Sequence, residues 1–142
     1  PGDVVRASNG KTIEIINTGS EHALGLPPTG RGGILAPYTA AKHAINGFTK
    51  SVAREVGTEG VTVNAICPGL VITDIIRSNG PATAETMGMT FDEMVAMFSR
   101  DSALQRPVTV EEVAALAVLL ASDAGSGITG AIMSVDGGTA QY

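Results

Sequence analysis

The sequence predicts an α/β fold in which strands alternate with helices and form one open, parallel sheet. Three β-branched, apolar segments, at 12–16, 61–67 and 128–135, are typical of buried strands. The segments at 38–56 and 109–120 carry apolar residues at three- and four-residue steps, which is typical of amphipathic helices. Strand, helix and strand in this order form a βαβ unit with parallel strands. We therefore expect the carboxyl ends of the strands to meet at one edge, where ligands bind in such folds.

The composition favours a single domain that binds a small ligand. The chain has 142 residues, which leaves no room for a second domain. Of these residues 44% are hydrophobic, which is enough for one core. A formal net charge of -5 argues against nucleic acid or an anionic membrane surface as the main partner. No run is long and apolar enough to span a bilayer. Cys67 is the single cysteine, so no internal disulfide is expected, and the absence of a signal-peptide pattern predicts a cytoplasmic location.

The first predicted strand, at 12–16, ends in the polar segment Asn17-Thr-Gly-Ser20. Residues 1–10, before it, are interpreted as the tail of a preceding helix. The Gly- and Pro-rich residues 21–36 are expected to form a loop. Ser20 therefore lies at the carboxyl end of the strand, at the predicted ligand-binding edge.

The helix predicted after Pro37 carries the clearest chemistry in the chain. Tyr38 and Lys42 are four residues apart and therefore share one face of the helix. An ammonium beside a phenol favours the phenolate, which suits a general acid/base. Apolar residues at helical spacing are expected to anchor the helix to the core, namely Ile45, Phe48, Val52 and Val56.

The strand at 61–67 ends at Pro68-Gly69, and a segment of different character follows. Residues 78–81, Ser-Asn-Gly-Pro, are expected to break the chain, and Thr90-Phe-Asp-Glu93 is a capping box that predicts a new helix. Four of the five methionines lie in this segment. They are consistent with a flexible flap over an apolar substrate, which we place at 74–106, and equally with ordinary filling of a core.

The last part of the chain repeats the order of helix and strand. Thr109-Val-Glu-Glu112 is a second capping box, which predicts a helix to about residue 123. The strand predicted at 128–135 is followed by Asp136-Gly-Gly138, which we interpret as a turn.

Four motifs along the chain together resemble the short-chain dehydrogenase/reductase family. They are Asn17-Thr-Gly-Ser20, Tyr38-Thr-Ala-Ala-Lys42, Asn64-Ala-Ile-Cys-Pro-Gly69, and Ile128-Thr-Gly130 with Val135-Asp-Gly-Gly138. A lone Tyr-x-x-x-Lys pattern is weak evidence, but the four motifs occur in the order of the family and cover almost the entire chain.

This resemblance implies a Rossmann-type, doubly wound parallel sheet in three α/β/α layers that binds NAD or NADP. It implies hydride transfer between the nicotinamide and a carbonyl or alcohol carbon. By position, Tyr38 would be the general acid/base, and Lys42 would favour its ionisation and bind the ribose. Ser20 would hold the substrate oxygen, with Thr18 as the alternative. The loop between Ser20 and Tyr38 is longer than is usual in the family.

The resemblance also assigns the cofactor contacts and the missing part of the domain. Pro68 and Gly69 would line the nicotinamide, and Ile72, through its backbone, and Thr73 would reach its carboxamide. The glycine-rich phosphate loop of the family precedes residue 1, so residues 1–142 would be the C-terminal part of a single NAD(P)-binding domain. The family's subunit contacts suggest a homotetramer or homodimer.

The residues present favour this interpretation over a non-catalytic protein, a metal site or a reactive cysteine. A non-catalytic scaffold or regulatory oligomer of the same fold has no need for Ser20, Tyr38 and Lys42 together. Glu21 and His22 do not have the spacing of metal ligands, so no metal is expected. Cys67, before a proline at a strand end, is interpreted as a small buried residue.

Overall fold

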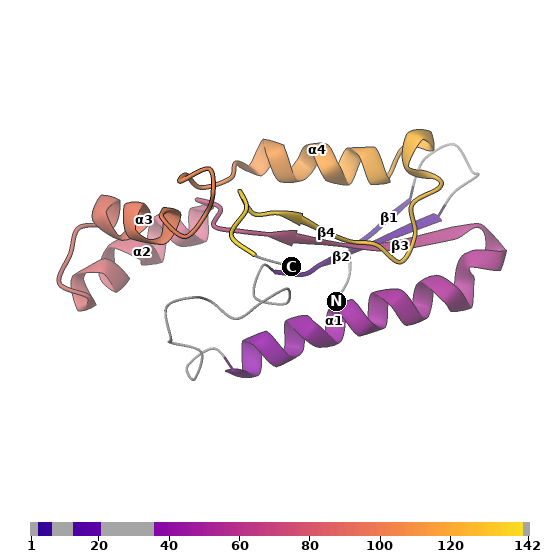
Figure 1. The fold of residues 1–142 in the computed structure, drawn as a ribbon, viewed down its shortest axis with the longest axis horizontal. Helices are drawn as coiled ribbons and strands as arrows, with labels where there is room; N and C mark the ends of the chain where they lie inside the picture. Colours follow the sequence, from indigo (N-terminus) through magenta and orange to yellow (C-terminus); the bar gives the residue numbers. More distant parts are fainter. Residues whose placement is uncertain (1–2, 7–12, 21–35, 141–142) are drawn as a thin grey trace.

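The computed structural model describes residues 3–6, 13–20 and 36–140, which form one four-stranded sheet with helices on both faces (Figure 1). The strands lie in the order β1 (Asp3–Arg6), β2 (Ile13–Thr18), β3 (Val61–Pro68) and β4 (Ile132–Val135). The pairs β2–β3 and β3–β4 are parallel, as predicted.

The strand β1 is a feature that the sequence did not reveal. It pairs antiparallel with β2, with Asp3 opposite Ile16 and Arg6 opposite Ile13. The interpretation of residues 1–10 as the tail of a helix is therefore wrong for Asp3–Arg6. The pairing has a physical reason, because it satisfies backbone groups along the edge of β2 that faces away from β3.

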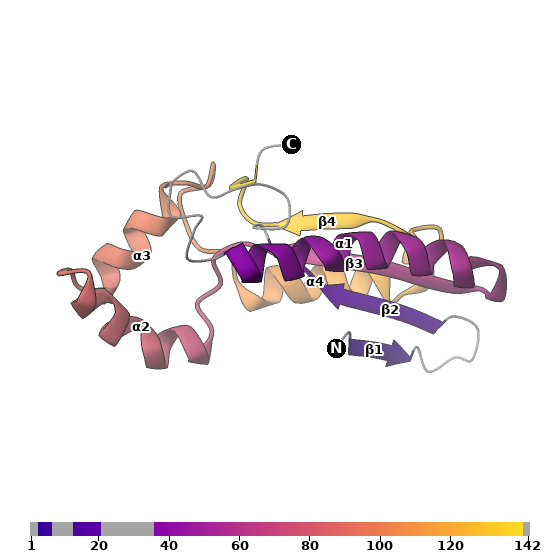
Figure 2. The same cartoon turned by 90° about the horizontal axis from the view of Figure 1, so that it is seen from below.

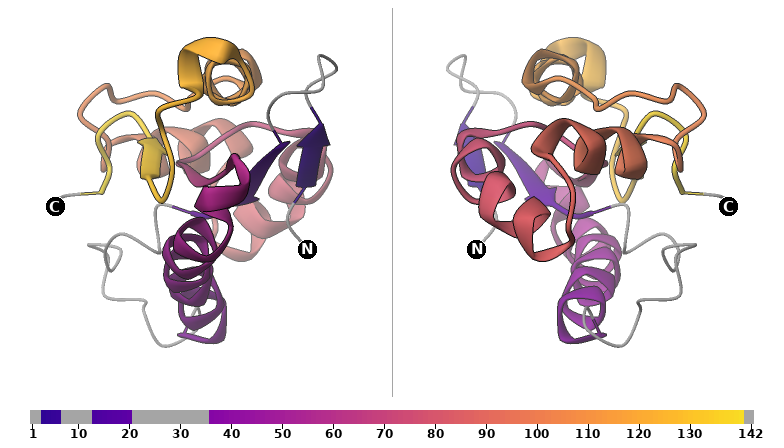
Figure 3. Two further views of the ribbon diagram at one scale, coloured as in Figure 1. Left: turned by 90° about the vertical axis from the view of Figure 1, so that its right-hand side faces the viewer. Right: turned by 90° about the vertical axis from the view of Figure 1, so that its left-hand side faces the viewer.

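Two of the helices cover opposite faces of the sheet. Figure 3 shows α1 (Ala36–Val56) on one face and α4 (Val110–Leu120) on the other. The short 3₁₀ turns η2 (Gly57–Glu59) and η3 (Asp123–Gly125) connect these helices to β3 and toward β4. The apolar face of α4 packs on the sheet as predicted, in a cluster that includes Ile16, Ile66, Val113, Leu116, Ala117 and Leu120.

The face that α1 turns to the sheet is partly the predicted one, because Ile45, Val52 and Val56 are half-buried as expected but Phe48 is not. Its buried residues are Thr49 and Ala53, whereas Phe48 is 57% exposed. Small side chains on the buried face allow the helix to lie close to β2 and β3, and a large ring does not fit there. Phe48, one position away along the helix, is turned outward.

The central strand β3 is the most deeply buried element, and it holds the segment that leads into β4. Asn64 is fully buried, donates to the carbonyl of Ile128 (2.8 Å) and accepts from the amide of Ala131 (3.1 Å). The strand predicted from residue 128 begins only at Ile132, because Gly130 has a positive φ of 70° and the residues on either side of it bond to the Asn64 side chain.

The helices α2 (Asp74–Thr86) and α3 (Phe91–Ser99) lie beyond the carboxyl ends of β3 and β4, apart from the sheet (Figure 2). The expected chain break at 78–81 is wrong, since α2 continues through Pro81. Pro81 removes one hydrogen bond, to the carbonyl of Arg77, but Arg77 is exposed, so water can reach it. Gly80 is buried against the ring of Phe91, which explains a glycine at this point.

Both predicted capping boxes are confirmed. Thr90 and Glu93 bond reciprocally at the start of α3, and Thr109 and Glu112 do so at the start of α4. The segment that contains α2 and α3 begins and ends at neighbouring points, because Val71 before α2 and Val108 after α3 form an isolated β-bridge. The amide of Val108 donates to the carbonyl of Leu70 (2.9 Å). Both ends of this segment are thus fixed beside the carboxyl end of β3.

Candidate active site

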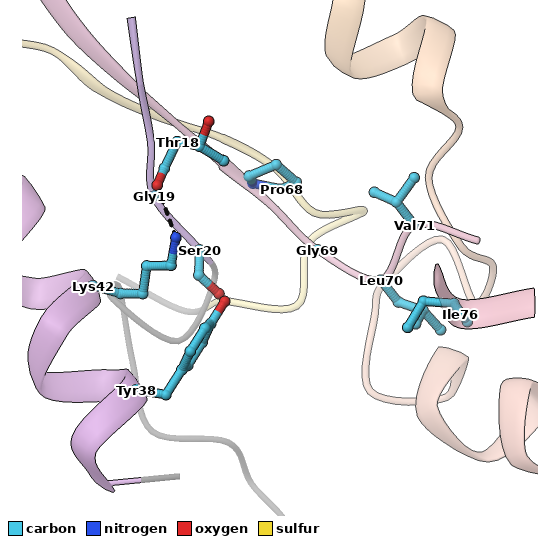
Figure 4. Close-up of a pocket in the computed structure, with 10 residues that line it drawn as sticks. All are labelled: Thr18, Gly19, Ser20, Tyr38, Lys42, Pro68, Gly69, Leu70, Val71 and Ile76. Atoms are coloured by element: carbon cyan, nitrogen blue, oxygen red, sulfur yellow. Dashed lines mark hydrogen bonds between the residues drawn. The ribbon is translucent and has the colours of Figure 1, made fainter. Parts of the chain in front are cut away.

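A pocket of about 310 Å³ lies at the carboxyl ends of β2 and β3 (Figure 4). Its walls come from four parts of the chain: the end of β2 at 18–20, Tyr38 and Lys42 on α1, the turn at 68–71, and Ile76 on α2. This is the edge at which parallel α/β sheets place their ligands. The βαβ arrangement therefore brings together residues that are far apart in the sequence.

The predicted pair on α1 faces the end of β2. The ammonium of Lys42 lies 5.6 Å from the centroid of the Tyr38 ring, and it donates a hydrogen bond to the backbone carbonyl of Thr18 (3.0 Å). The cation is held by a fixed backbone acceptor, next to the phenol.

Ser20 completes the polar side of the pocket. Figure 4 shows the hydroxyl groups of Ser20 and Tyr38 turned toward each other. Ser20 is 6% exposed and Tyr38 is 45% exposed, so the phenol reaches from the solvent side toward a buried hydroxyl. Thr18, the alternative to Ser20, contributes its carbonyl oxygen to Lys42.

The strand β3 supports the end of β2 from behind. The amide of Gly19 donates to the carbonyl of Ile66 (2.7 Å), and the amide of Ser20 donates to the thiol of Cys67. Cys67 is fully buried, as expected. Burial raises the pKa of its thiol, against the opposing effects of the Ser20 amide and the charge of Lys42. The thiol is a packing group under Ser20.

The residues predicted to contact a nicotinamide divide into two groups. Pro68 and Gly69 line the pocket, whereas Ile72 and Thr73 follow the lining residues and lead into α2. A side chain at Gly69 would meet the Cα of Asp136 at 2.7 Å, and the amide of Gly69 donates to Val135 (3.0 Å). The close approach that requires glycine here is therefore to the turn after β4.

Three apolar lining residues were not singled out from the sequence. Leu70 and Val71 follow Pro68-Gly69 directly, and Ile76 lies in the first turn of α2. Their position just after a strand that ends at the ligand edge is the signal that could have identified them. They place an apolar wall opposite the hydroxyl groups of Ser20 and Tyr38 (Figure 4).

This arrangement can exchange a proton with an oxygen atom of a small molecule. A phenol and a buried hydroxyl can both bond to one oxygen, and the nearby ammonium stabilises negative charge. Within residues 3–6, 13–20 and 36–140, no group of three His, Cys, Asp or Glu side chains could hold a metal ion. No helix in this described part is long and apolar enough to cross a membrane. His22 lies outside the described residues.

Comparison with known proteins identifies the family. A family described as enoyl-(acyl carrier protein) reductase matches residues 8–140. The D-beta-hydroxybutyrate dehydrogenase of Rhizobium meliloti is 43% identical over 129 residues, which are 89% of this chain and 48% of that protein. The crystal structure of a short chain dehydrogenase family protein from Francisella tularensis has a TM-score of 0.78 and 32% identity, over 89% of this chain and 50% of that one. The chain belongs to the short-chain dehydrogenase/reductase family.

One solved structure of this short-chain dehydrogenase/reductase family that resembles the chain contains a nicotinamide cofactor. An actinorhodin polyketide ketoreductase crystallised with NADPH has a TM-score of 0.78 and 29% identity, over 93% of this chain and 49% of that one. The chain spans about half the length of the curated relatives it matches. The Rossmann-type fold predicted from the four motifs is confirmed.

Proposed function

We propose that the whole protein is an NAD(P)-dependent oxidoreductase that transfers a hydride between the nicotinamide and a carbonyl or alcohol carbon. The observation that carries this proposal is the convergence of Ser20, Tyr38 and Lys42 on one pocket, beside Pro68 and Gly69. Membership of the short-chain dehydrogenase/reductase family supports it.

The described residues supply the proton-transfer half of this reaction. In reduction, the Tyr38 phenol donates its proton to the carbonyl oxygen, and in oxidation the phenolate removes the proton of the alcohol. Ser20 donates a hydrogen bond to the same oxygen as negative charge develops on it. Lys42 favours the ionised phenol, and its anchor on the Thr18 carbonyl holds the charge in place.

The donor set around the pocket fits the nicotinamide half of the cofactor. The ammonium of Lys42 suits the ribose hydroxyls, and the rigid Pro68–Gly69 turn suits the flat face of the nicotinamide ring. We assign the carboxamide to Ile72, through its backbone, and to Thr73. The bound cofactor supplies or accepts the hydride. The proposal covers NAD and NADP.

We propose that the substrate carries an apolar group next to its carbonyl or alcohol carbon. Leu70, Val71 and Ile76 form the wall opposite the polar groups, and apolar contact there favours an uncharged substituent. We also propose that residues 74–106 act as the substrate-binding flap, since Ile76 of this wall lies on α2 and α3 follows α2 beyond the end of the sheet (Figure 2).

The substitution Tyr38→Phe tests the proposal against the alternative, a non-catalytic scaffold or regulatory oligomer. Loss of one hydroxyl removes the proton donor, so we expect hydride transfer to fall at least about a hundredfold, while the phenyl ring keeps the fold. The measurement is nicotinamide absorbance with a panel of ketones and alcohols, on the whole protein. Circular dichroism and thermal unfolding provide the control for folding.

Retention of full activity in this variant would reject the assignment of Tyr38. No turnover and no cofactor binding by the wild-type protein would reject the enzyme and leave the scaffold.

We further propose a cytoplasmic location and a homo-oligomer, a dimer or tetramer. Analytical ultracentrifugation of the whole protein tests the oligomer, and a monomer at micromolar concentration would exclude it.

A further inference from the structure

A buried hydrogen bond joins β2 to α1 at a distance from the pocket. The side-chain amide of Asn17 donates to the hydroxyl of Thr49 (2.9 Å). Asn17 is 5% exposed and Thr49 is fully buried. Thr49 follows Lys42 on the same helix by about two turns. The bond is therefore more buried than Tyr38 and Lys42, and it lies on the same helix, α1.

The contacts between β2 and α1 follow a regular order. α1 begins at the carboxyl end of β2 and runs back along the strand (Figure 1). Asn17 accordingly meets Thr49, the carbonyl of Thr18 meets Lys42, and Ser20 faces Tyr38 across the pocket (Figure 4). The first of these contacts is buried, whereas the Lys42 contact is exposed.

The Asn17–Thr49 bond is a directional contact on the buried face of α1. Thr49 and Ala53 are the most deeply buried residues of the helix, with Ile45, Val52 and Val56 half-buried, and apolar packing alone is non-directional and does not fix rotation about the helix axis. A hydrogen bond does, because it requires one short distance and a narrow range of angles. A rotation of about 10° moves an atom at side-chain radius by about 1 Å.

We propose that Asn17 and Thr49 are positioning residues that set the rotation of α1, and thereby the places of Lys42 and Tyr38 relative to Thr18 and Ser20. This inference rests on the proposed function, since it gives these residues a role in hydride transfer. A misplacement of about 1 Å at the reacting groups can cost about a hundredfold in rate.

Substitutions at this pair separate positioning from stability. Thr49→Val removes the hydroxyl and leaves the Asn17 amide buried without its partner, so both stability and kcat should fall. Thr49→Ser keeps the hydroxyl and should retain nearly full activity. The double variant Asn17→Leu with Thr49→Val removes both polar groups, which restores much of the stability because no buried donor is left unpaired.

The decisive comparison is the double variant. We expect its unfolding midpoint to approach that of the wild type, while its kcat stays at least about tenfold lower and its KM for the carbonyl substrate changes less than about twofold. The matched control is Thr62→Val, which removes a buried hydroxyl from β3 that has no hydrogen-bond partner among the described residues. This control should leave kcat unchanged. Recovery of kcat together with stability in the double variant would overturn the inference.

A second readout does not depend on activity. In a crystal structure of the double variant, the bond from Lys42 to the Thr18 carbonyl should be lost, whereas an intact bond would overturn the inference. If the wild-type protein shows no nicotinamide-linked turnover, the proposed function fails, and this structural readout alone decides whether Asn17 and Thr49 position α1.

Discussion

The ammonium of Lys42 has two neighbours with different effects. The Thr18 carbonyl accepts its hydrogen bond, and the Tyr38 ring lies 5.6 Å away. The backbone carbonyl restricts where the flexible lysine side chain can place its charge, so less conformational entropy remains to be lost when a ligand binds. The site is to this extent preorganised before any ligand enters.

Cys67 offers a test of how tightly the end of β2 is supported. The thiolate is the reactive form of cysteine, and burial raises the pKa of this thiol. We therefore expect Cys67 of the native protein to remain unlabelled by iodoacetamide at neutral pH for the time that labels it fully in denaturant. Peptide mass spectrometry after labelling measures both. Equal labelling of native and denatured protein would show that the packing under Ser20 opens readily.

At the scale of single residues, the sequence predicted which side chains lie together where spacing or strand position carries the information. Tyr38 and Lys42 share a helix face because they are four residues apart, and Ser20 lies at the ligand edge because it ends a strand. The acceptor of Lys42 could not be predicted, since a backbone carbonyl has no sequence signature. Asn17 and Thr49 were missed for a related reason: their contact exists only once α1 lies on β2.

Among the elements, α4 owes part of its stability to its first turn. Arg106 donates hydrogen bonds to both carboxylate oxygens of Glu112. The amide of Thr109 also donates to this carboxylate, and the amide of Glu112 donates to the Thr109 hydroxyl. The hydrogen bonds from Arg106 are the main cause that lowers the pKa of Glu112 to about 2, and the Thr109 amide adds to the effect. A lowered pKa means that the native state is stabilised while this carboxylate is ionised.

This pKa shift predicts a pH dependence of stability. The contribution of Glu112 is fully present above its ordinary pKa of 4.5 and is lost as the pH falls toward about 2. We expect Glu112→Gln to lower the free energy of unfolding at neutral pH and to flatten its dependence on pH in that window. Urea unfolding at several pH values measures this. The pair is partly exposed, at 46% and 39%, so the effect should be small and should weaken in salt.

The control is Glu111→Gln, which removes the same charge from the first turn of α4 without touching the Arg106 pair. If both variants showed the same slope between these pH values, the stabilisation would come from the charge at the helix terminus and not from the ion pair.

Two glycines in helices should respond in opposite ways to substitution by alanine. A Cβ at Gly80 would overlap the ring of Phe91, so Gly80→Ala should destabilise the protein by about 1–3 kcal/mol through displacement of α3. A Cβ at Gly47 on α1 would meet no atom within 4 Å, so Gly47→Ala should stabilise it by about 0.5–1 kcal/mol through helix propensity. Urea unfolding compares the two, and partial rescue of Gly80→Ala by Phe91→Leu would confirm the cause. A stabilised Gly80→Ala variant would contradict this packing.

The elements were predictable where their signals are local. The capping boxes at Thr90 and Thr109 involve residues three positions apart, and both helices start where expected. The break predicted at 78–81 failed because Gly and Pro are weak helix residues only on average, and here a neighbouring ring requires Gly80. The exposure of Phe48 shows the same limit, because periodicity alone does not say which of two adjacent residues faces the sheet.

For the whole molecule, the proposed function predicts stabilisation by the cofactor. A ligand that binds only the native state raises the free energy of unfolding by about 2.7 kcal/mol at a hundred times its Kd. We expect NADH or NADPH to raise the unfolding temperature of the whole protein, and the form that acts at the lower concentration to be the natural cofactor. Thermal unfolding monitored by fluorescence measures this, with FAD as the control ligand. No shift with either nicotinamide would contradict the proposal.

The whole sheet was predicted except at one edge. The parallel order of β2, β3 and β4 follows from the alternation of strands and helices. The antiparallel β1 was not predicted, because its pairing depends on the edge of β2 that faces away from β3 and not on a pattern within residues 1–10.

The hydrogen bond from Gly69 to Val135 also has a consequence for the order of folding. The described residues that line the pocket lie between Thr18 and Ile76, so the ribosome releases them before β4 is made. The unit β2–α1–β3 can form early, but the partners of Gly69 and Asn64 come from the later segment, 64 and 67 residues away in the case of Asn64. Until that segment arrives, one edge of β3 remains open to pairing with other chains. The pocket should thus be among the last parts of the nascent protein to become rigid, and a ribosome that stalls before β4 should leave an aggregation-prone product.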